Sequence, residues 1–169
     1  AYRSMEFIRD DVCFQNLNVK IIGMGSGLSW SSLGPTHHTT EDVSVLRAIP
    51  NLMLLSPATP NQVRACVDKA YKHKGPVYIK IGMNHEKEYY NDDCTIEETG
   101  MDVISRGTDI LIFVTGSILE EVMGASDMLQ KDKVSANIIN VTTLKPFNSK
   151  YAIALMQKYN KMYCVEEQN

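Results

Sequence analysis

Two adjacent histidines, His37 and His38, are the residues of this 169-residue sequence best placed to do chemistry. They lie in the stretch GLSWSSLGPTHHTTED, where glycine and serine predict a long loop and Thr39 or Thr40 predicts the cap of a following helix. A histidine in a loop after a strand can titrate near neutral pH and move protons to and from hydroxyl groups. The alternative, that both rings only hydrogen-bond the backbone of a turn, stays open on residue type alone. Trp30 in the same loop either packs against the fold or stacks on a substrate ring.

The histidine pair is a poor chelate for a metal ion. Adjacent side chains in an extended chain point to opposite sides, and no carboxylate cluster lies near the pair in the sequence. The four cysteines show no CxxC spacing and lack the density of a disulfide scaffold. We therefore predict no metal ligand in this chain and a reducing, cytoplasmic compartment.

The composition is that of a globular protein, with 44% hydrophobic residues, 22% charged residues and a net charge of -3. Lysine and arginine are scattered, so the basic stripe typical of a nucleic-acid binder is missing. No apolar run approaches the roughly 20 residues that a membrane span needs. We expect neither a nucleic acid nor a membrane as partner.

The first half of the sequence alternates helix and strand patterns, which predicts an α/β fold with mostly parallel strands. One helix has Val63, Val67, Ala70 and Tyr71 as its predicted apolar face, with Thr59 as cap and Pro60 at its first position. The predicted helices are 2–15, 41–49 and 60–74, and the predicted strands are 19–24, 52–56 and 77–81.

A polar stretch without periodicity, residues 84–108, predicts a linker that has room for one strand. After it the alternation resumes, and LKPFN is predicted as a turn. The later strands are predicted at 110–115, 136–141 and 162–167, and the helices at 118–131 and 149–159. The whole chain is thus predicted to form two three-layer α/β/α units, residues 1–90 and 108–169, joined by a linker at 91–107.

Several motifs resemble thiamine diphosphate enzymes. The segment from IRDDVCF to PATPNQV resembles the pyrimidine-binding domain of the transketolase family, and its GPTHH is also similar to deoxyxylulose phosphate synthase. The later GTDILIFVTGS, INVTTLKPFN and YCVEEQN are similar, in the same order, to the family's C-terminal domain. SLGPTHHTTED resembles above all the separate C-terminal subunits of split transketolases. The resemblance implies a fragment made of part of each domain.

The resemblance implies transfer of a two-carbon ketol unit between sugars. His37 matches the family histidine that contacts the sugar hydroxyls, which implies a catalytic and substrate-binding role. His38 matches a position occupied by histidine or glutamine, which implies substrate binding. Alternatives are a 1-deoxy-D-xylulose-5-phosphate synthase, a 2-oxo acid dehydrogenase β subunit, and a non-catalytic paralogue that serves as an interaction or regulatory subunit.

The resemblance also implies thiamine diphosphate and Mg²⁺, shared with another part. The family's activating glutamate and its aromatic pocket precede the part that matches Ala1, so the cofactor-binding residues of this chain are unknown. The GDG motif and the asparagine that hold the diphosphate and magnesium belong to another domain. The expected partner is a diphosphate-binding N-terminal subunit or domain, in a homodimer or heterotetramer, and the chain alone is not expected to be active.

Two positions depart from the family pattern. Leu33 stands where an aspartate often precedes GPTH, and Met83 stands where an arginine often grips the substrate phosphate. Neither side chain supplies a charged contact, so these two positions leave open whether the sugar is phosphorylated, unphosphorylated or differently modified. Lys80 and Lys87 are substitutes for the arginine by charge, although both are expected to be solvated.

Overall fold

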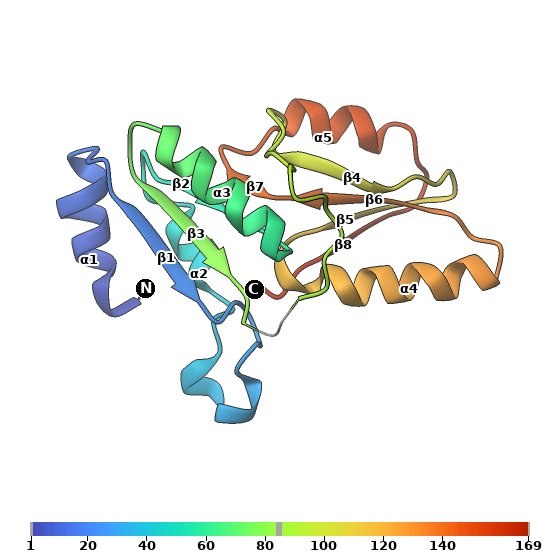
Figure 1. The fold of residues 1–169 in the computed structure, drawn as a ribbon, viewed down its shortest axis with the longest axis horizontal. Coiled ribbons are helices and arrows are strands. Elements are labelled where there is room, and N and C mark those ends of the chain that lie inside the picture. Colours follow the sequence, from blue (N-terminus) through green and yellow to red (C-terminus); the bar gives the residue numbers. More distant parts are fainter. Residues whose placement is uncertain (1, 84–85, 169) are drawn as a thin grey trace.

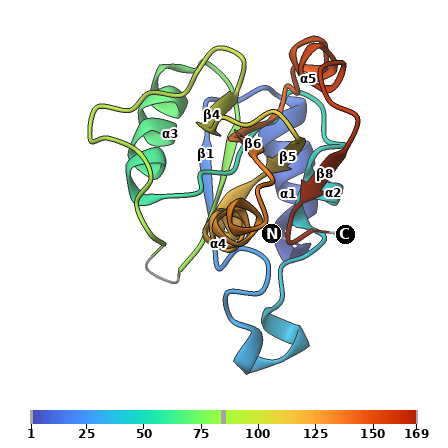
Figure 2. The same cartoon turned by 90° about the vertical axis from the view of Figure 1, so that its right-hand side faces the viewer.

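The protein, seen in a computed structural model that describes residues 2–83 and 86–168, contains two four-stranded sheets, each with helices on both faces (Figure 1). The strand order is β1-β3-β2-β7 in the first sheet and β4-β6-β5-β8 in the second. Figure 2 shows the layers of the second sheet nearly end-on. The predicted α/β class with two three-layer units is confirmed.

The first sheet is mostly parallel. β1 (Lys20–Met24) and β2 (Met53–Leu55) both pair in parallel with β3 (Val77–Ile81). Its fourth strand, β7 (Thr143–Lys145), pairs antiparallel with β2 and comes from the second half of the chain. The sequence analysis predicted a turn at LKPFN and did not predict this strand. Because β7 pairs with β2, the two halves of the chain share one sheet.

Helices cover both faces of the first sheet. A helical stretch runs through a 3-10 turn (Tyr2–Ser4), α1 (Met5–Phe7) and a π-helical segment (Ile8–Phe14), as predicted for residues 2–15. The other two helices are α2 (Asp42–Leu46) and α3 (Pro60–Lys72). The hydroxyl of Thr59 accepts a hydrogen bond from the Gln62 backbone N–H at 3.4 Å, which confirms the predicted cap of α3.

The predicted apolar face of α3 was wrong in part. Val67 is 44% exposed and Tyr71 is 82% exposed, whereas Cys66 and Ala70 pack against the sheet. Small side chains let the helix lie close to the strands, and the larger residues are left on the outer side. Periodicity alone identified a helix here but not which of its stripes packs inward.

Strand β3 supplies both cores of the first sheet because side chains alternate across a strand. Val77 and Ile79 pack with α3, while Tyr78 packs on the opposite face with Ile8 and Leu46. Lys80 follows Tyr78 by two residues and points to the same face. A lysine is therefore buried in the layer between the sheet and α2.

The second sheet is built around β6, all of whose residues are buried. One of its faces packs on α4 through Ile110, Ile112 and Ile138, and the other packs on α5 through Leu111 and Ile139. The elements are β4 (Met101–Ser105), β5 (Ile110–Val114), α4 (Leu119–Lys131), β6 (Ala136–Val141), α5 (Ser149–Met156) and β8 (Met162–Val165).

Strand β4 lies in the polar stretch 84–108, which was predicted to have room for a strand, and it pairs antiparallel with β6. The division of the chain at residues 91–107 stays a prediction. No helix among residues 2–83 and 86–168 is both long enough and apolar enough to cross a membrane.

A buried polar network joins the two units. Gln62 on α3 donates from Nε2 to Asp102 Oδ2 at 2.9 Å and to Thr142 Oγ1 at 2.8 Å. Asn140 on β6 donates from Nδ2 to Gln62 Oε1 and to the Tyr90 hydroxyl, both at 2.9 Å. Tyr90 in turn donates to Asp102 Oδ2 at 3.2 Å. Burial raises the pKa of the Asp102 carboxyl above its usual range, against hydrogen bonds that lower it.

We expect Asp102→Asn to change how stability depends on pH. Folding raises the pKa of Asp102, so protonated Asp102 contributes to the free energy of unfolding. This contribution is greatest below about pH 4 and declines as pH rises through the raised pKa. The unfolding free energy of the wild type minus that of the variant should therefore fall as pH rises. Urea unfolding of both proteins across this range measures the difference.

Asp109→Asn is the matched control, because hydrogen bonds from Ser135 lower the pKa of Asp109. For this exposed residue the difference should have the opposite slope, rising with pH through the ordinary carboxyl range. A wild-type advantage over Asp102→Asn that grows with pH would contradict the expectation.

Candidate functional site

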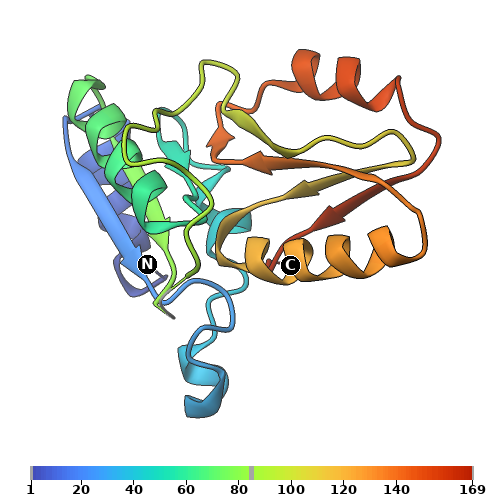
Figure 3. The ribbon, with the colours of Figure 1, turned by 45° about the vertical axis from the view of Figure 1, so that its right-hand side comes forward.

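The two histidines lie on a loop that projects from the body of the protein (Figures 1 and 3). We call residues 25–40 the histidine loop. It leaves the end of β1, carries two 3-10 turns (Ser31–Leu33 and Pro35–His37), and returns to α2. The loop predicted from glycine and serine is thus confirmed.

His37 has one ring nitrogen fixed and the other open. The Thr36 hydroxyl lies 3.0 Å from Nδ1 of His37, and either atom can donate, depending on the tautomer. Nε2 of His37 has no hydrogen-bond partner among the described residues. The Trp30 ring meets the imidazole edge-to-face, with 6.1 Å between ring centres and a 70° angle between their planes. An exposed imidazole held in this way can exchange a proton with a bound molecule.

His38 lines the same cavity as His37, next to Trp30 and Tyr2. The cavity holds about 460 Å³, enough for a small polar molecule. Both histidines line one cavity, although an extended chain would direct them to opposite sides, and Pro35–His37 form a 3-10 turn in place of extended chain. Nε2 of His38 lies 3.4 Å from the Ser31 carbonyl oxygen, so this ring also holds the loop together.

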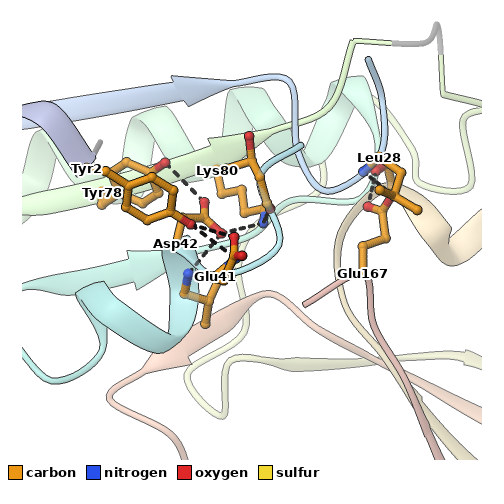
Figure 4. Close-up of polar contacts among 10 residues, drawn as sticks. Tyr2, Leu28, Glu41, Asp42, Tyr78, Lys80 and Glu167 are labelled. Atoms are coloured by element: carbon orange, nitrogen blue, oxygen red, sulfur yellow. Dashed lines mark hydrogen bonds and ion pairs between the residues drawn. The ribbon is translucent and has the colours of Figure 1, made fainter. Parts of the chain in front are cut away.

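A buried ion pair fixes the point where the histidine loop enters α2 (Figure 4). Lys80 Nζ lies 2.6 Å from Asp42 Oδ1, and the two side chains are 2% and 0% exposed. Lys80 also donates to the Thr39 carbonyl oxygen at 3.0 Å, and the Tyr78 hydroxyl donates to Asp42 Oδ2 at 3.2 Å. Asp42 Oδ1 accepts the backbone N–H of Val43 at 2.8 Å. Every charge in this layer therefore has partners.

The predicted threonine cap of α2 was wrong, and the helix begins at Asp42. Thr39 forms an isolated bridge with Gly27 across the base of the loop, and its carbonyl oxygen is bound by Lys80. These contacts hold Thr39 outside the helix.

Tyr2 closes the cavity on the side of the N-terminal helical stretch. Its hydroxyl donates to Glu41 Oε2 at 3.0 Å and accepts the Glu41 backbone N–H at 3.2 Å. Burial raises the pKa of Tyr2 to about 12, with the Glu41 carboxylate as a further cause. Tyr2 therefore stays neutral and acts as a hydrogen-bonding wall.

Leu33 and Met83, the two positions that depart from the family pattern, do not line the histidine cavity. Leu33 is 58% exposed at the end of the first 3-10 turn, and Met83 is exposed after β3. Lys80 was expected to be solvated, and this was wrong because Asp42 holds it in the core. Lys87 is exposed as expected, and its Nζ lies 5.5 Å from the centre of the Tyr89 ring.

The sequence analysis did not foresee the roles of three residues that shape the site: Lys80, Asp42 and Glu167. The alternation of VYIKI places Lys80 on the face of Tyr78. The available signal for its partner was Asp42, an acidic residue at the start of the helix that follows the histidine loop. Glu167 accepts a hydrogen bond from the Leu28 backbone N–H at 3.3 Å, from 139 residues away in sequence. No local pattern signals that contact.

The residues that the structure describes do not fit a complete cofactor site. No group of three or more His, Cys, Asp or Glu side chains among them is arranged to hold a metal ion. The buried lysine of this region, Lys80, is neutralised by Asp42 and cannot hold a phosphate group.

Comparison with known proteins places this geometry in a family. Residues 1–85 match the model of the transketolase pyrimidine-binding domain, and residues 100–169 match that of the transketolase C-terminal domain. The chain belongs to the transketolase family. Residues 86–99, which neither model matches, lie in the polar stretch before β4.

Relatives of this transketolase-family chain include separate subunits. The chain is 31% identical over 167 residues to a subunit of the apulose-4-phosphate transketolase of Actinobacillus succinogenes, covering 99% of this chain and 54% of that protein. It is 30% identical to the 6-deoxy-6-sulfo-D-fructose transketolase subunit SqwH of Clostridium sp. strain MSTE9, covering 92% of this chain and 48% of the relative. The chain thus spans about half the length of these relatives.

A solved structure shares the fold over nearly the whole chain. The structure of a split-gene transketolase, described as an inactive β4 tetramer, superposes with a TM-score of 0.88 and 29% identity. It matches 98% of this chain, which corresponds to 54% of the solved chain. The transketolase of Pichia stipitis, at 18% identity and a TM-score of 0.78, shows the same fold.

We expect Lys80→Met to lower the free energy of unfolding by about 3–5 kcal/mol, because it leaves the charge of Asp42 buried without its partner. The double variant Lys80→Met, Asp42→Asn should lose less than Lys80→Met alone, since no buried charge remains. Urea unfolding at neutral pH measures all three proteins.

Lys87→Met is the matched control, because Lys87 is exposed and its removal should cost no more than about 1 kcal/mol. A loss for Lys80→Met as small as that of the control would show that the buried pair does not hold the loop to the sheet.

Proposed function

We propose that this chain is a C-terminal-type subunit, or a fragment, of a thiamine diphosphate-dependent transketolase that transfers a two-carbon ketol unit between sugars. The observation that carries the proposal is His37, which lines the cavity, has Nδ1 held by Thr36 and leaves Nε2 without a partner among the described residues. Family membership and the names of the relatives support it.

His37 would act as the proton relay of the reaction. Ketol transfer would need a group that gives a proton to the oxygen of the ketose carbonyl and takes a proton from a hydroxyl as the carbon-carbon bond breaks. The Thr36 hydroxyl can either donate to Nδ1 or accept from it, so it supports both tautomers of His37. Nε2 can then accept a proton in one half of the reaction and return it in the other.

His38 would bind the sugar rather than move its protons. Its Nε2 is directed to the Ser31 carbonyl oxygen at 3.4 Å, and this contact favours the tautomer with a proton on Nε2. The ring forms a wall of the cavity beside His37. We propose that His38 contributes a hydrogen bond or a packing surface to one end of the sugar.

Thiamine diphosphate, which carries the two-carbon unit in this class of enzyme, and Mg²⁺ would be held together with a diphosphate-binding N-terminal subunit or domain. The names of the relatives as subunits, and the half-length match to them, support such a partner. A homodimer or heterotetramer is the proposed assembly. The four free cysteines support a reducing cytoplasm as its compartment.

The sugar is proposed to be unphosphorylated or differently modified. Leu33 and Met83 carry no charge, and Lys80 is engaged by Asp42. One relative is named for a sulfonated sugar, 6-deoxy-6-sulfo-D-fructose, and another for a phosphorylated one, apulose-4-phosphate.

A second candidate function is 1-deoxy-D-xylulose-5-phosphate synthase. The enzyme of this name from Halothermothrix orenii is 30% identical over 98% of this chain. The uncharged Met83 favours the transketolase, because a phosphate-gripping arginine is expected in the synthase. A 2-oxo acid dehydrogenase β subunit is disfavoured by the histidine pair, and a non-catalytic interaction or regulatory subunit is the candidate from another class.

We expect His37→Ala to lower kcat/KM for ketol transfer by roughly 10²–10⁴-fold, because general acid–base catalysis typically contributes that much. The assay uses the complete enzyme, with its diphosphate-binding partner and both cofactors, and follows transfer from a ketose to an aldose. His73→Ala is the matched control, since His73 lies at the end of α3 and does not line the cavity.

Activity of His37→Ala equal to that of His73→Ala would remove the proton-relay role. Absence of thiamine-dependent activity in the wild-type complex would instead favour the non-catalytic subunit.

We expect His38→Ala to raise KM for the sugar by about tenfold with little change in kcat, because a binding contact present in both ground and transition states is lost. Steady-state kinetics with varied sugar concentration measure both constants. A loss in kcat as large as that of His37→Ala would show that His38 also takes part in the chemistry.

A further inference from the structure

Glu167 connects the second unit of the protein to the base of the histidine loop (Figure 4). It follows β8, and its Oε1 accepts the Leu28 backbone N–H at 3.3 Å. Its Oε2 accepts the Ser117 hydroxyl at 2.8 Å, in the 3-10 turn Gly116–Ile118 that precedes α4. One carboxylate thus ties three segments together.

The backbone of the loop is shaped to receive this side chain. A Cβ atom at Gly27 would lie 2.6 Å from Glu167 Oε1, which no larger residue allows. Gly27 also has a φ of 55°, a conformation that glycine adopts without strain. The contact between Glu167 and residues 27–28 is therefore a close fit and more than a single hydrogen bond.

The other contacts at the base of the loop come from the first unit. The Ser26 backbone N–H donates to the Ile81 carbonyl oxygen at 3.0 Å, and the Thr39 N–H donates to the Gly27 carbonyl oxygen at 2.9 Å. Gly27 therefore contacts Glu167 on one side and Thr39 on the other. Thr39 directly follows His38, so a shift at Gly27 is passed to the histidines through one bridge.

We propose that Glu167 is a positioning residue for His37. It holds residues 27–28 so that the bridge from Gly27 to Thr39 keeps both histidines at the cavity. Glu167 does not line the histidine cavity, so it acts through the loop and not on the sugar. The inference deepens the proposed function and rests on it for its catalytic consequence.

The geometry of the contact predicts which substitutions are tolerated. Glutamine keeps the length of the side chain, and it can accept from Leu28 through Oε1 and donate to the Ser117 hydroxyl through Nε2. Aspartate keeps the charge but is shorter by one methylene group. If position is what matters, Glu167→Gln is tolerated, whereas Glu167→Asp and Glu167→Ala are not.

Two readouts on the intact enzyme follow the loop without relying on catalysis. Peptide-resolved hydrogen exchange should show Leu28 and its neighbours exchanging about tenfold faster or more in Glu167→Ala, the loss expected for a hydrogen bond to a charged group. ¹⁹F NMR of 5-fluorotryptophan, assigned with Trp30→Phe, reports the contact between Trp30 and His37. Its chemical shift should change in Glu167→Ala, because the Trp30 ring loses its contact with His37, and should stay at the wild-type value in Glu167→Gln.

Catalysis supplies the third readout, and Glu166→Ala supplies the control. Glu167→Ala should lower kcat by about tenfold, in proportion to the misplacement of His37, and Glu167→Gln should restore most of it. Glu166 is exposed and adjacent in sequence, so Glu166→Ala reports what any loss of charge at this end of the chain does.

The outcomes separate the two proposals. Unchanged exchange at Leu28 and an unchanged Trp30 signal in Glu167→Ala would overturn the positioning role, as would equal effects from Glu166→Ala. The positioning role would also be overturned if Glu167→Asp kept the wild-type Trp30 signal and Glu167→Gln lost it. That result would favour a purely electrostatic role. If the loop readouts respond to Glu167 while His37→Ala keeps full activity, positioning stands and the proposed proton relay fails.

Discussion

The arrangement of the site depends on one buried ion pair, between Lys80 and Asp42. Removing a lysine and an aspartate from water costs several kcal/mol for each ion, and their attraction offsets this only when the remaining donors and acceptors are also satisfied. Lys80 finds the Thr39 carbonyl oxygen, and Asp42 finds the Tyr78 hydroxyl. Strand β3, the end of the histidine loop and the start of α2 must therefore adopt one mutual position, because any other leaves a buried charge without a partner.

Much of the fold was predictable because its elements follow simple periodicities. The helix at 2–14, the cap at Thr59 and the strands β3, β5 and β6 agree with their predicted places. The histidine loop was also predictable from its glycines and serines. Local patterns failed where packing decides: Val67 fits a helical stripe but faces solvent, and Lys80 carries a charge but lies in the core.

The contacts that shape the site were beyond sequence reasoning because they join distant segments. Glu167 and Leu28 are separated by 139 residues, and neither residue type signals the other. Strand β7 has only three residues, next to a proline, so it resembles a turn. Its partner β2 is chosen by the fold as a whole and not by any local propensity.

The position of strand β7 in the sequence affects how the first sheet assembles during synthesis. It completes the first sheet at the edge of β2, yet the ribosome synthesises it after β3, α3, β4, β5, α4 and β6. Until residue 145 has emerged, the nascent chain carries β2 with one side unpaired, and an unpaired strand edge invites association with other chains. The first three strands of the first sheet are thus synthesised early, and the free edge of β2 is covered only after most of the second unit has been synthesised.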